Sequence, residues 1–292
     1  MKSKTEVLFP IWGCLNEIGK FIGKPNIDWV SNNHTQDEFL KRFSHMSGLV
    51  DQIGNNLKSK ADVQVSVINT WLRDNGFNIQ LDETRGAEFA VASILNILVE
   101  WCIPGKEIQM LTKSGIISAV HIKDNCSGNI SQYKESSQNP NPIVRLDTKN
   151  HDRVFITKVG DYDDDNFVVS QLVDMAVKNI KLTRLEECEA VKFPMVDYDQ
   201  ETDISWIEGM AVGPNDNDYF IGQAMQQTQF RMNEKGARAK SACAMMTKRG
   251  IMADSTVVID EPFLLWIQRK GISEPLFSGV FAEDSWGKPV EL

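Results

Sequence analysis

The chain has 292 residues, of which 42% are hydrophobic and 24% charged, so it has the composition of an ordinary globular protein with room for one large domain or two small ones. Its formal net charge of -9 argues against a nucleic-acid binder, which needs a basic surface to neutralise phosphates. No apolar run approaches the ~20 residues that a membrane-spanning helix needs. We therefore expect neither a nucleic-acid partner nor a membrane partner.

The cysteines are odd in number, scattered, and contain no Cys-x-x-Cys pair; they are Cys14, Cys102, Cys126, Cys188 and Cys243. This pattern predicts reduced thiols rather than a disulfide scaffold or a zinc site. Near the amino end, Glu6, Pro10 and Asn16 interrupt any signal-like apolar core, which favours a cytoplasmic localisation over secretion.

The first elements are predicted from apolar spacing. Residues 6–22 have the spacing of an amphipathic helix, and residues 26–30 have that of a short strand. Thr35 followed by Glu38 has the form of a capping box and predicts that a second helix opens there.

Two apolar segments follow. Val63, Val65 and Val67 alternate, which predicts a strand over residues 63–72. Residues 89–99 form a nearly continuous apolar run that ends at Glu100-Trp101, and periodicity leaves a buried strand and a buried helix equally open.

The second half alternates between loops and regular elements. Residues 125–142, rich in Ser, Asn, Gln and Pro, predict a surface loop, and residues 168–185 predict a helix. Residues 190–198 predict a strand and residues 203–210 a short helix. Residues 161–166 begin like a calcium loop but have Asn166 where glycine is needed, so we expect no metal there. The order of elements predicts an α+β fold with mostly antiparallel sheets.

The most informative stretch begins at Asn233-Glu234-Lys235-Gly236 and continues into small residues. If the stretch is a strand, one face is small or apolar throughout; it consists of Ala237, Ala239, Ser241, Cys243 and Met245. The other face carries Arg238 and Lys240, and a slip by one residue would bury both charges. The segment therefore suits a sheet in one register only. Taken alone, its composition equally allows a flexible loop.

Residues 247–250 then form a polar, protease-cleavable site, and two apolar segments follow, Asp260–Ile267 and Pro275–Gly279. This order of hinge, exposed loop and paired carboxyl-terminal strands resembles the serpin family of protease inhibitors. The resemblance implies one serpin-like domain over residues 1–292, with an exposed reactive-centre loop at about residues 237–257. The chain is short for that family, so we expect a reduced serpin fold with a main antiparallel sheet, smaller sheets and fewer helices than usual.

The resemblance also implies an activity. Serpins are suicide substrates: a protease cleaves the loop, and the loop, here residues 237–246, then inserts into the main sheet and traps the enzyme. Counting from Glu234, as the family does, places the cleaved bond at Arg249-Gly250, with Lys248 as the alternative anchor. A basic residue there suits a trypsin-like serine protease, whereas Met245-Met246 would suit a chymotrypsin-like or cathepsin-like enzyme. The expected partner is that protease, bound by a monomer without a cofactor.

Weaker matches concern the region beneath the sheet, called the shutter, and its upper end, called the breach. Ser31, His34 and Gln226 resemble shutter positions, with His34 and Gln226 as an exchanged pair; Trp101 resembles the breach tryptophan. The simpler interpretations are that His34 is only a turn residue and that Trp101 is an ordinary core tryptophan. One alternative function is a serpin-fold protein that binds a partner without inhibiting. A second is an enzyme or toxin domain whose tail only mimics the family, and no pair of titratable residues supports it.

Overall fold

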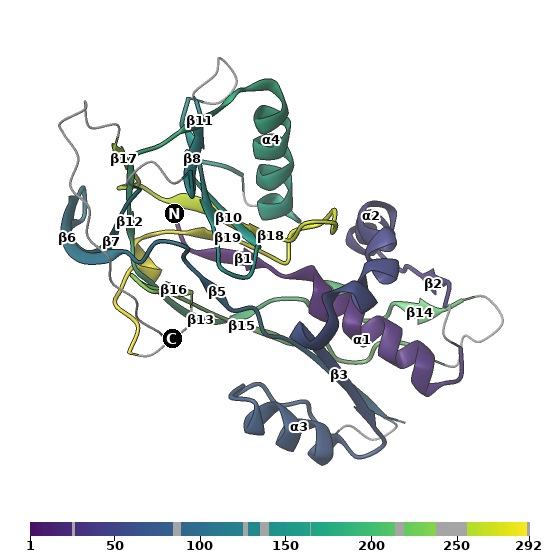
Figure 1. Cartoon of the computed structure of the whole chain (residues 1–292). Helices are drawn as coiled ribbons and strands as arrows, with labels where there is room; N and C mark the ends of the chain where they lie inside the picture. Colours follow the sequence, from purple (N-terminus) through teal and green to yellow (C-terminus); the bar gives the residue numbers. More distant parts are fainter. Residues whose placement is uncertain are drawn as a thin grey trace. The chain divides into compact units, whose positions relative to one another are not determined.

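The chain forms two compact units, each assembled from separated stretches of sequence. The computed structural model describes residues 1–24, 27–83, 89–124, 128–134, 140–163, 165–213, 219–237 and 256–290. Unit 1 comprises residues 1–6, 98–198 and 229–292, and unit 2 comprises residues 7–97 and 199–228. Strand β13 (Val196–Thr202) pairs with β15 (Gln226–Met232), and both strands pass from one unit into the other (Figure 1).

The largest sheet lies in unit 1 and has seven strands, all paired antiparallel. In spatial order they are β1 (Lys4–Glu6), β19 (Phe277–Phe281), β18 (Phe263–Gln268), β10 (Arg153–Lys158), β9 (Ile143–Asp147), β8 (Ile130–Tyr133) and β11 (Leu185–Glu187). All five residues of β19 and the first five of β18 are buried, which explains the uninterrupted apolar run of β18. The predicted pairing of the last two strands is confirmed.

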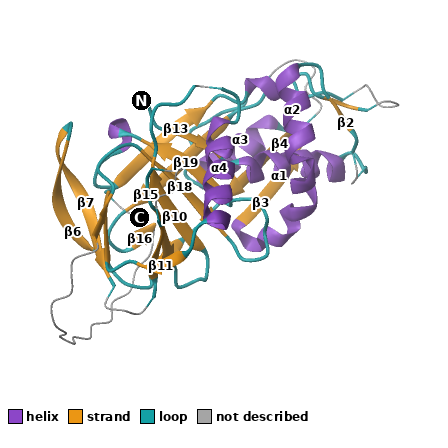
Figure 2. Cartoon of the chain, turned by 90° about the horizontal axis from the view of Figure 1, so that it is seen from above, coloured by secondary structure: helices purple, strands orange, loops and turns teal. Residues whose placement is uncertain are grey.

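Helix α4 (Val168–Leu182) packs against this sheet, beside β18 and β19 (Figures 1 and 2). Its apolar face joins a core in which Phe155 stacks on Trp266, with ring centroids 4.8 Å apart. The helix start is held from the end of β1, because the two carboxylate oxygens of Glu6 accept hydrogen bonds from the backbone N–H groups of Val169 and Ser170, each at 2.9 Å. A carboxylate at a helix amino end also complements the helix dipole.

A second sheet of unit 1 has four strands, β17 (Thr256–Val258), β12 (Ala190–Pro194), β7 (Gly115–Lys123) and β6 (Lys106–Thr112), in that order. The single strand predicted at residues 190–198 is wrong in extent, since β12 ends at Pro194 and β13 begins at Val196. The loop predicted at residues 125–142 is also wrong in part. It contains β8, whose first two residues are buried although the surrounding sequence is polar. A short 3-10 turn, η3 (Glu283–Ser285), follows β19.

Unit 2 is built around α1 (Leu8–Phe21), which packs on an antiparallel pair, β3 (Leu57–Asp62) and β4 (Ala90–Leu95). The helix predicted at residues 6–22 is confirmed, and the apolar run at 89–99 is a strand whose residues alternate in burial. Gly13 allows the close approach of α1 to the pair, because a Cβ there would overlap Ser93 Oγ. Asn56 Nδ2 donates to Asn96 O at 2.8 Å just past the end of the pair.

The strand predicted at residues 63–72 is wrong, because α3 (Val65–Asp74) is a helix. Ile68 and Leu72 are buried at helical spacing, whereas Val63 is 64% exposed, so the alternating valines were a misleading signal. The predicted capping box at Thr35 is also wrong. Helix α2 (His34–Phe43) is capped two residues earlier, where Asn33 Oδ1 accepts a hydrogen bond from Gln36 N at 2.9 Å.

The remaining elements of unit 2 are short. The helix α2 continues as the 3-10 segment η1 (Ser44–Asn56), and β2 (Trp29–Val30) pairs with β14 (Ala211–Val212). The helix predicted at 203–210 is only the single turn η2 (Ser205–Ile207). Among the residues that the structure describes there are four α-helices, and none of them is long and apolar enough to span a membrane.

Because of the Cys14 thiol, on α1, we expect the free energy of unfolding to fall as the pH becomes alkaline. Cys14 is only partly buried as a residue, but its thiol is enclosed, and this burial, with the charge of Glu17, raises its pKa to about 12. An unfolded chain releases this proton above about pH 8.5. The stabilisation is therefore complete below that pH and is lost as pH rises towards 12.

We expect the free energy of unfolding, measured in urea, to fall between pH 8.5 and 10, and Cys14→Ala to flatten that fall. Cys14→Ala is the direct comparison because it removes only the titrating group. An equal pH dependence in both proteins would contradict the assignment to Cys14.

Candidate functional site

The predicted hinge is a tight reversal between two strands. Strand β15 ends at Met232, and β16 (Gly236–Ala237) begins after a turn formed by residues 233–236, which we call the hinge turn. Asn233 N donates to Gly236 O at 2.9 Å, and Gly236 N donates to Asn233 O at 3.3 Å. Asn233 Oδ1 also accepts a hydrogen bond from Lys235 N at 2.9 Å, an Asx-type turn that explains an asparagine at this position.

Beyond the turn, the hinge is already part of a sheet. Strand β16 pairs antiparallel with β5 (Val99–Glu100), with Gly236 opposite Glu100 and Ala237 opposite Val99. Gly236 has φ +148°, and a Cβ there would overlap Val99 O and lie 2.9 Å from the Glu100 Cα. Only glycine fits so close to the partner backbone.

Trp101 anchors the hinge turn from the residue after β5. Its indole Nε1 donates to Asn233 O at 3.0 Å, and its backbone N–H donates to Lys235 O at 3.4 Å. The side chain is 2% exposed and its ring meets the edge of Phe193, with centroids 6.0 Å apart. Trp101 is thus a core residue whose indole also contacts the hinge backbone, and its interpretation as the breach tryptophan stays a prediction.

The Glu234 backbone is also fixed, because Gly105 N donates to Glu234 O at 2.7 Å. Its side chain is less well satisfied. Oε2 is buried and accepts no hydrogen bond from the described residues, although such an oxygen ordinarily costs about 1–3 kcal/mol. The hinge therefore combines a firmly held backbone with one poorly solvated carboxylate.

These contacts place the hinge between two strands that belong to different small sheets. On one side Asn233, next to β15, bridges Gly236, and on the other side β16 pairs with β5. The local order is therefore β13, β15, β16, β5. Among the described residues, the hinge pairs with β5 and not with a strand of the seven-stranded sheet.

The proposed shutter residues lie in unit 2. Gln226 donates from Nε2 to Val7 O at 2.8 Å, just before α1. Ser31 Oγ instead donates to Asp37 Oδ1, and His34 is an exposed residue at the start of α2. Within the described part of the chain no hydrogen bond joins His34 to Gln226, so the structure brings Gln226 to α1 and leaves His34 apart.

The loop itself is outside the described residues. This applies to the insertion positions Ala239, Ser241, Cys243 and Met245, and to the reactive-bond residues Lys248, Arg249 and Gly250. Sequence reasoning missed two contributions. Gly105 donates a hydrogen bond to the Glu234 backbone, and the turn before β10 contacts β5, the strand that pairs with the hinge. Their only signals were a Pro104-Gly105 step and an ordinary Asn-His-Asp turn.

Comparison with known proteins gives these contacts a family context. The family model described as serpin (serine protease inhibitor) matches residues 196–283, the part of the chain that contains β15 and the hinge turn. No curated protein sequence matches the chain.

Solved structures agree over nearly the whole length. Serpin48 of the insect Tenebrio molitor is 12% identical with a TM-score of 0.61, covering 96% of this chain and 92% of that one. Thyroxine-binding globulin in complex with thyroxine is 10% identical with a TM-score of 0.62 and the same coverage. The thermophilic serpin tengpin in its native state is 12% identical with a TM-score of 0.59, covering 97% and 89%.

The chain therefore has the serpin fold, in a reduced form with four α-helices among the described residues. The resemblance to the serpin family, which is a family of protease inhibitors, is confirmed by the family match and by the structural similarity.

Proposed function

We propose that the protein inhibits a trypsin-like serine protease as a suicide substrate. The observation that carries the proposal is the antiparallel pairing of Gly236–Ala237 with β5. The hinge has the strand conformation that a loop entering the sheet between β15 and β5 would need. In this register Ala237 lies opposite Val99, which is buried.

The chemistry begins with attack by the protease serine hydroxyl on the carbonyl carbon of Arg249. The C–N bond to Gly250 breaks, the Gly250 amine leaves with the serine proton, and an acyl ester joins Arg249 to the protease. Insertion of residues from 238 onward then removes the ester from its aligned position before water hydrolyses it. Each inserted residue contributes about 0.5–1.5 kcal/mol per ladder hydrogen bond, so many together make the step effectively irreversible.

The competing function is binding without trapping. One similar structure is a thyroxine-binding globulin in complex with thyroxine, so the fold also serves ligand binding. In that case the loop is cleaved as an ordinary substrate and does not enter the sheet.

Incubation with trypsin distinguishes the two. We expect a product of the summed masses that survives denaturing electrophoresis, and a cleaved inhibitor that melts well above the intact chain. Nicking with no such product and an unchanged melting temperature would exclude trapping and leave the binding function.

A further inference from the structure

The strand that receives the hinge is fixed along its other edge by a regular set of contacts. They recur every second residue: Cys102 N donates to Asp147 O at 3.2 Å, Lys149 N donates to Glu100 O at 2.9 Å, and Asn150 Nδ2 donates to Leu98 O at 2.9 Å. The first two are backbone bonds to the turn between β9 and β10. At Leu98 the donor is instead the side-chain amide of Asn150.

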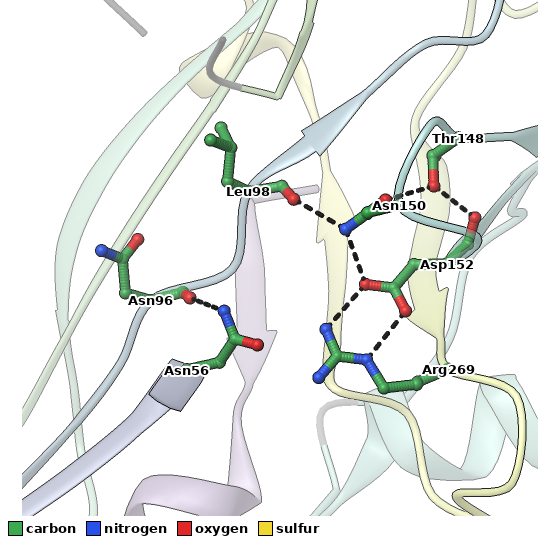
Figure 3. A network of polar contacts seen from close by, with 7 residues as sticks. All are labelled: Asn56, Asn96, Leu98, Thr148, Asn150, Asp152 and Arg269. Atoms are coloured by element: carbon green, nitrogen blue, oxygen red, sulfur yellow. Dashed lines mark hydrogen bonds and ion pairs between the residues drawn. The ribbon is translucent and has the colours of Figure 1, made fainter. Parts of the chain in front are cut away.

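The Asn150 amide is held at both ends. Nδ2 also donates to Asp152 Oδ2 at 3.0 Å, while Oδ1 accepts a hydrogen bond from Thr148 Oγ1 at 2.6 Å. Figure 3 shows the amide nitrogen between the Leu98 carbonyl and the Asp152 carboxylate. Because both partners of Nδ2, the Leu98 carbonyl and the Asp152 carboxylate, are acceptors only, one orientation of the amide is fixed.

Asp152 is in turn clamped by Arg269, which follows β18. The guanidinium donates from Nε to Oδ1 and from its terminal nitrogen to Oδ2, each at 2.9 Å, a two-pronged contact (Figure 3). Asp152 is only 1% exposed, and its hydrogen bonds with the guanidinium raise the pKa of Arg269 above the ordinary value for arginine. Between Asn150 and Asp152, His151 has φ +66°, a left-handed conformation that the surrounding bonds maintain.

Leu98 is the next position in the register after the observed Ala237–Val99 pair. A loop that continues into the sheet would therefore pair with Leu98 first. Leu98 is the residue whose carbonyl accepts the hydrogen bond from Asn150. We propose that Asn150, braced by Asp152 and Arg269, is a positioning residue that keeps β5 in register for the incoming loop. The role in trapping rests on the proposed function, whereas the effect on β5 does not.

The test compares Asn150→Ala with Asn141→Ala in the full chain. Asn141 is the matched control because its side chain also donates to a backbone carbonyl, Lys158 O at 3.3 Å, but away from β5. We expect Asn150→Ala to raise by at least fivefold the number of inhibitor molecules cleaved per trypsin trapped. We also expect amide exchange at residues 99–102 and 236–237 to accelerate at least tenfold. Asn141→Ala should change neither.

If Asn150→Ala does not fold, Arg269→Lys replaces it, since lysine keeps the charge but lacks the two-pronged contact. Unchanged exchange in β5, or an equal rise in both asparagine variants, would overturn the proposal. If the wild-type protein traps no trypsin, the proposed function fails separately. Exchange in β5 then decides the inference: acceleration in Asn150→Ala supports the positioning role, and its absence refutes it.

Discussion

On the proposed function, replacing Gly236 with alanine is expected to make the chain a protease substrate instead of a protease inhibitor. The added Cβ would overlap Val99 O, and the residue would be left with φ +148°. Strain of this kind costs about 1–3 kcal/mol, which at about 1.4 kcal/mol per tenfold slows sheet entry by roughly 5- to 150-fold. Hydrolysis of the acyl ester is then faster than insertion of the loop. The measurement is the ratio of cleaved inhibitor to trapped trypsin.

Gly160→Ala is the control for the Gly236 prediction. Gly160 also lies in unit 1, but a Cβ there meets no atom within 4 Å and its φ is not in the left-handed range. This variant should trap trypsin like the wild type. Trapping by Gly236→Ala at the wild-type ratio would show that the hinge does not need the pairing seen with β5.

Replacing Arg249 with alanine is expected to abolish the trapping of trypsin. A trypsin-like protease has a carboxylate at the bottom of its specificity pocket, and leaving a buried charge partner unpaired costs about 2–5 kcal/mol. The rate of complex formation should therefore fall by roughly 30-fold or more, at about 1.4 kcal/mol per tenfold.

Lys248→Ala is the matched control, since it removes a neighbouring cation and should leave trapping nearly unchanged. Mass spectrometry of the released peptide identifies the cleaved bond in each protein. A loss of trapping in Lys248→Ala with activity retained in Arg249→Ala would move the reactive bond one residue towards the amino end. Retention in the double variant, which carries both Lys248→Ala and Arg249→Ala, would refute a basic anchor.

The carboxyl-terminal strand pair was predictable because its signal is local. A buried strand such as β18 shows as an unbroken apolar run. The helix α1 was equally clear from its spacing. Each of these elements needs little information from distant residues.

The errors occurred where tertiary contacts overrule a local pattern. Alternating valines predicted a strand at α3, but burial of Ile68 and Leu72 decides for the helix. Asn33 rather than Thr35 caps α2, and its side chain accepts a hydrogen bond from Gln36 N. The Gln36 side chain is fully buried and donates to Trp206 O and Glu208 O, each at 2.9 Å, so distant residues also fix this end of the helix. The bond from Asn150 to Leu98 joins residues 52 positions apart, so no window of sequence reveals it.

The pairing of β1 with β19 has a consequence for how the protein is made. It joins Lys4–Glu6 to residues 278–280, so one edge of the seven-stranded sheet closes only after almost the whole chain has left the ribosome. At ~5–20 residues per second, the amino-terminal strand waits on the order of tens of seconds for its partner. During that time the Glu6 carboxylate, which later holds the start of α4, also lacks the β1–β19 pairing that positions it. Residues 233–237 emerge before β18 and β19, so the hinge segment is complete before the sheet of its own unit can close. The hinge segment is therefore synthesised before the two strands that complete the sheet of unit 1.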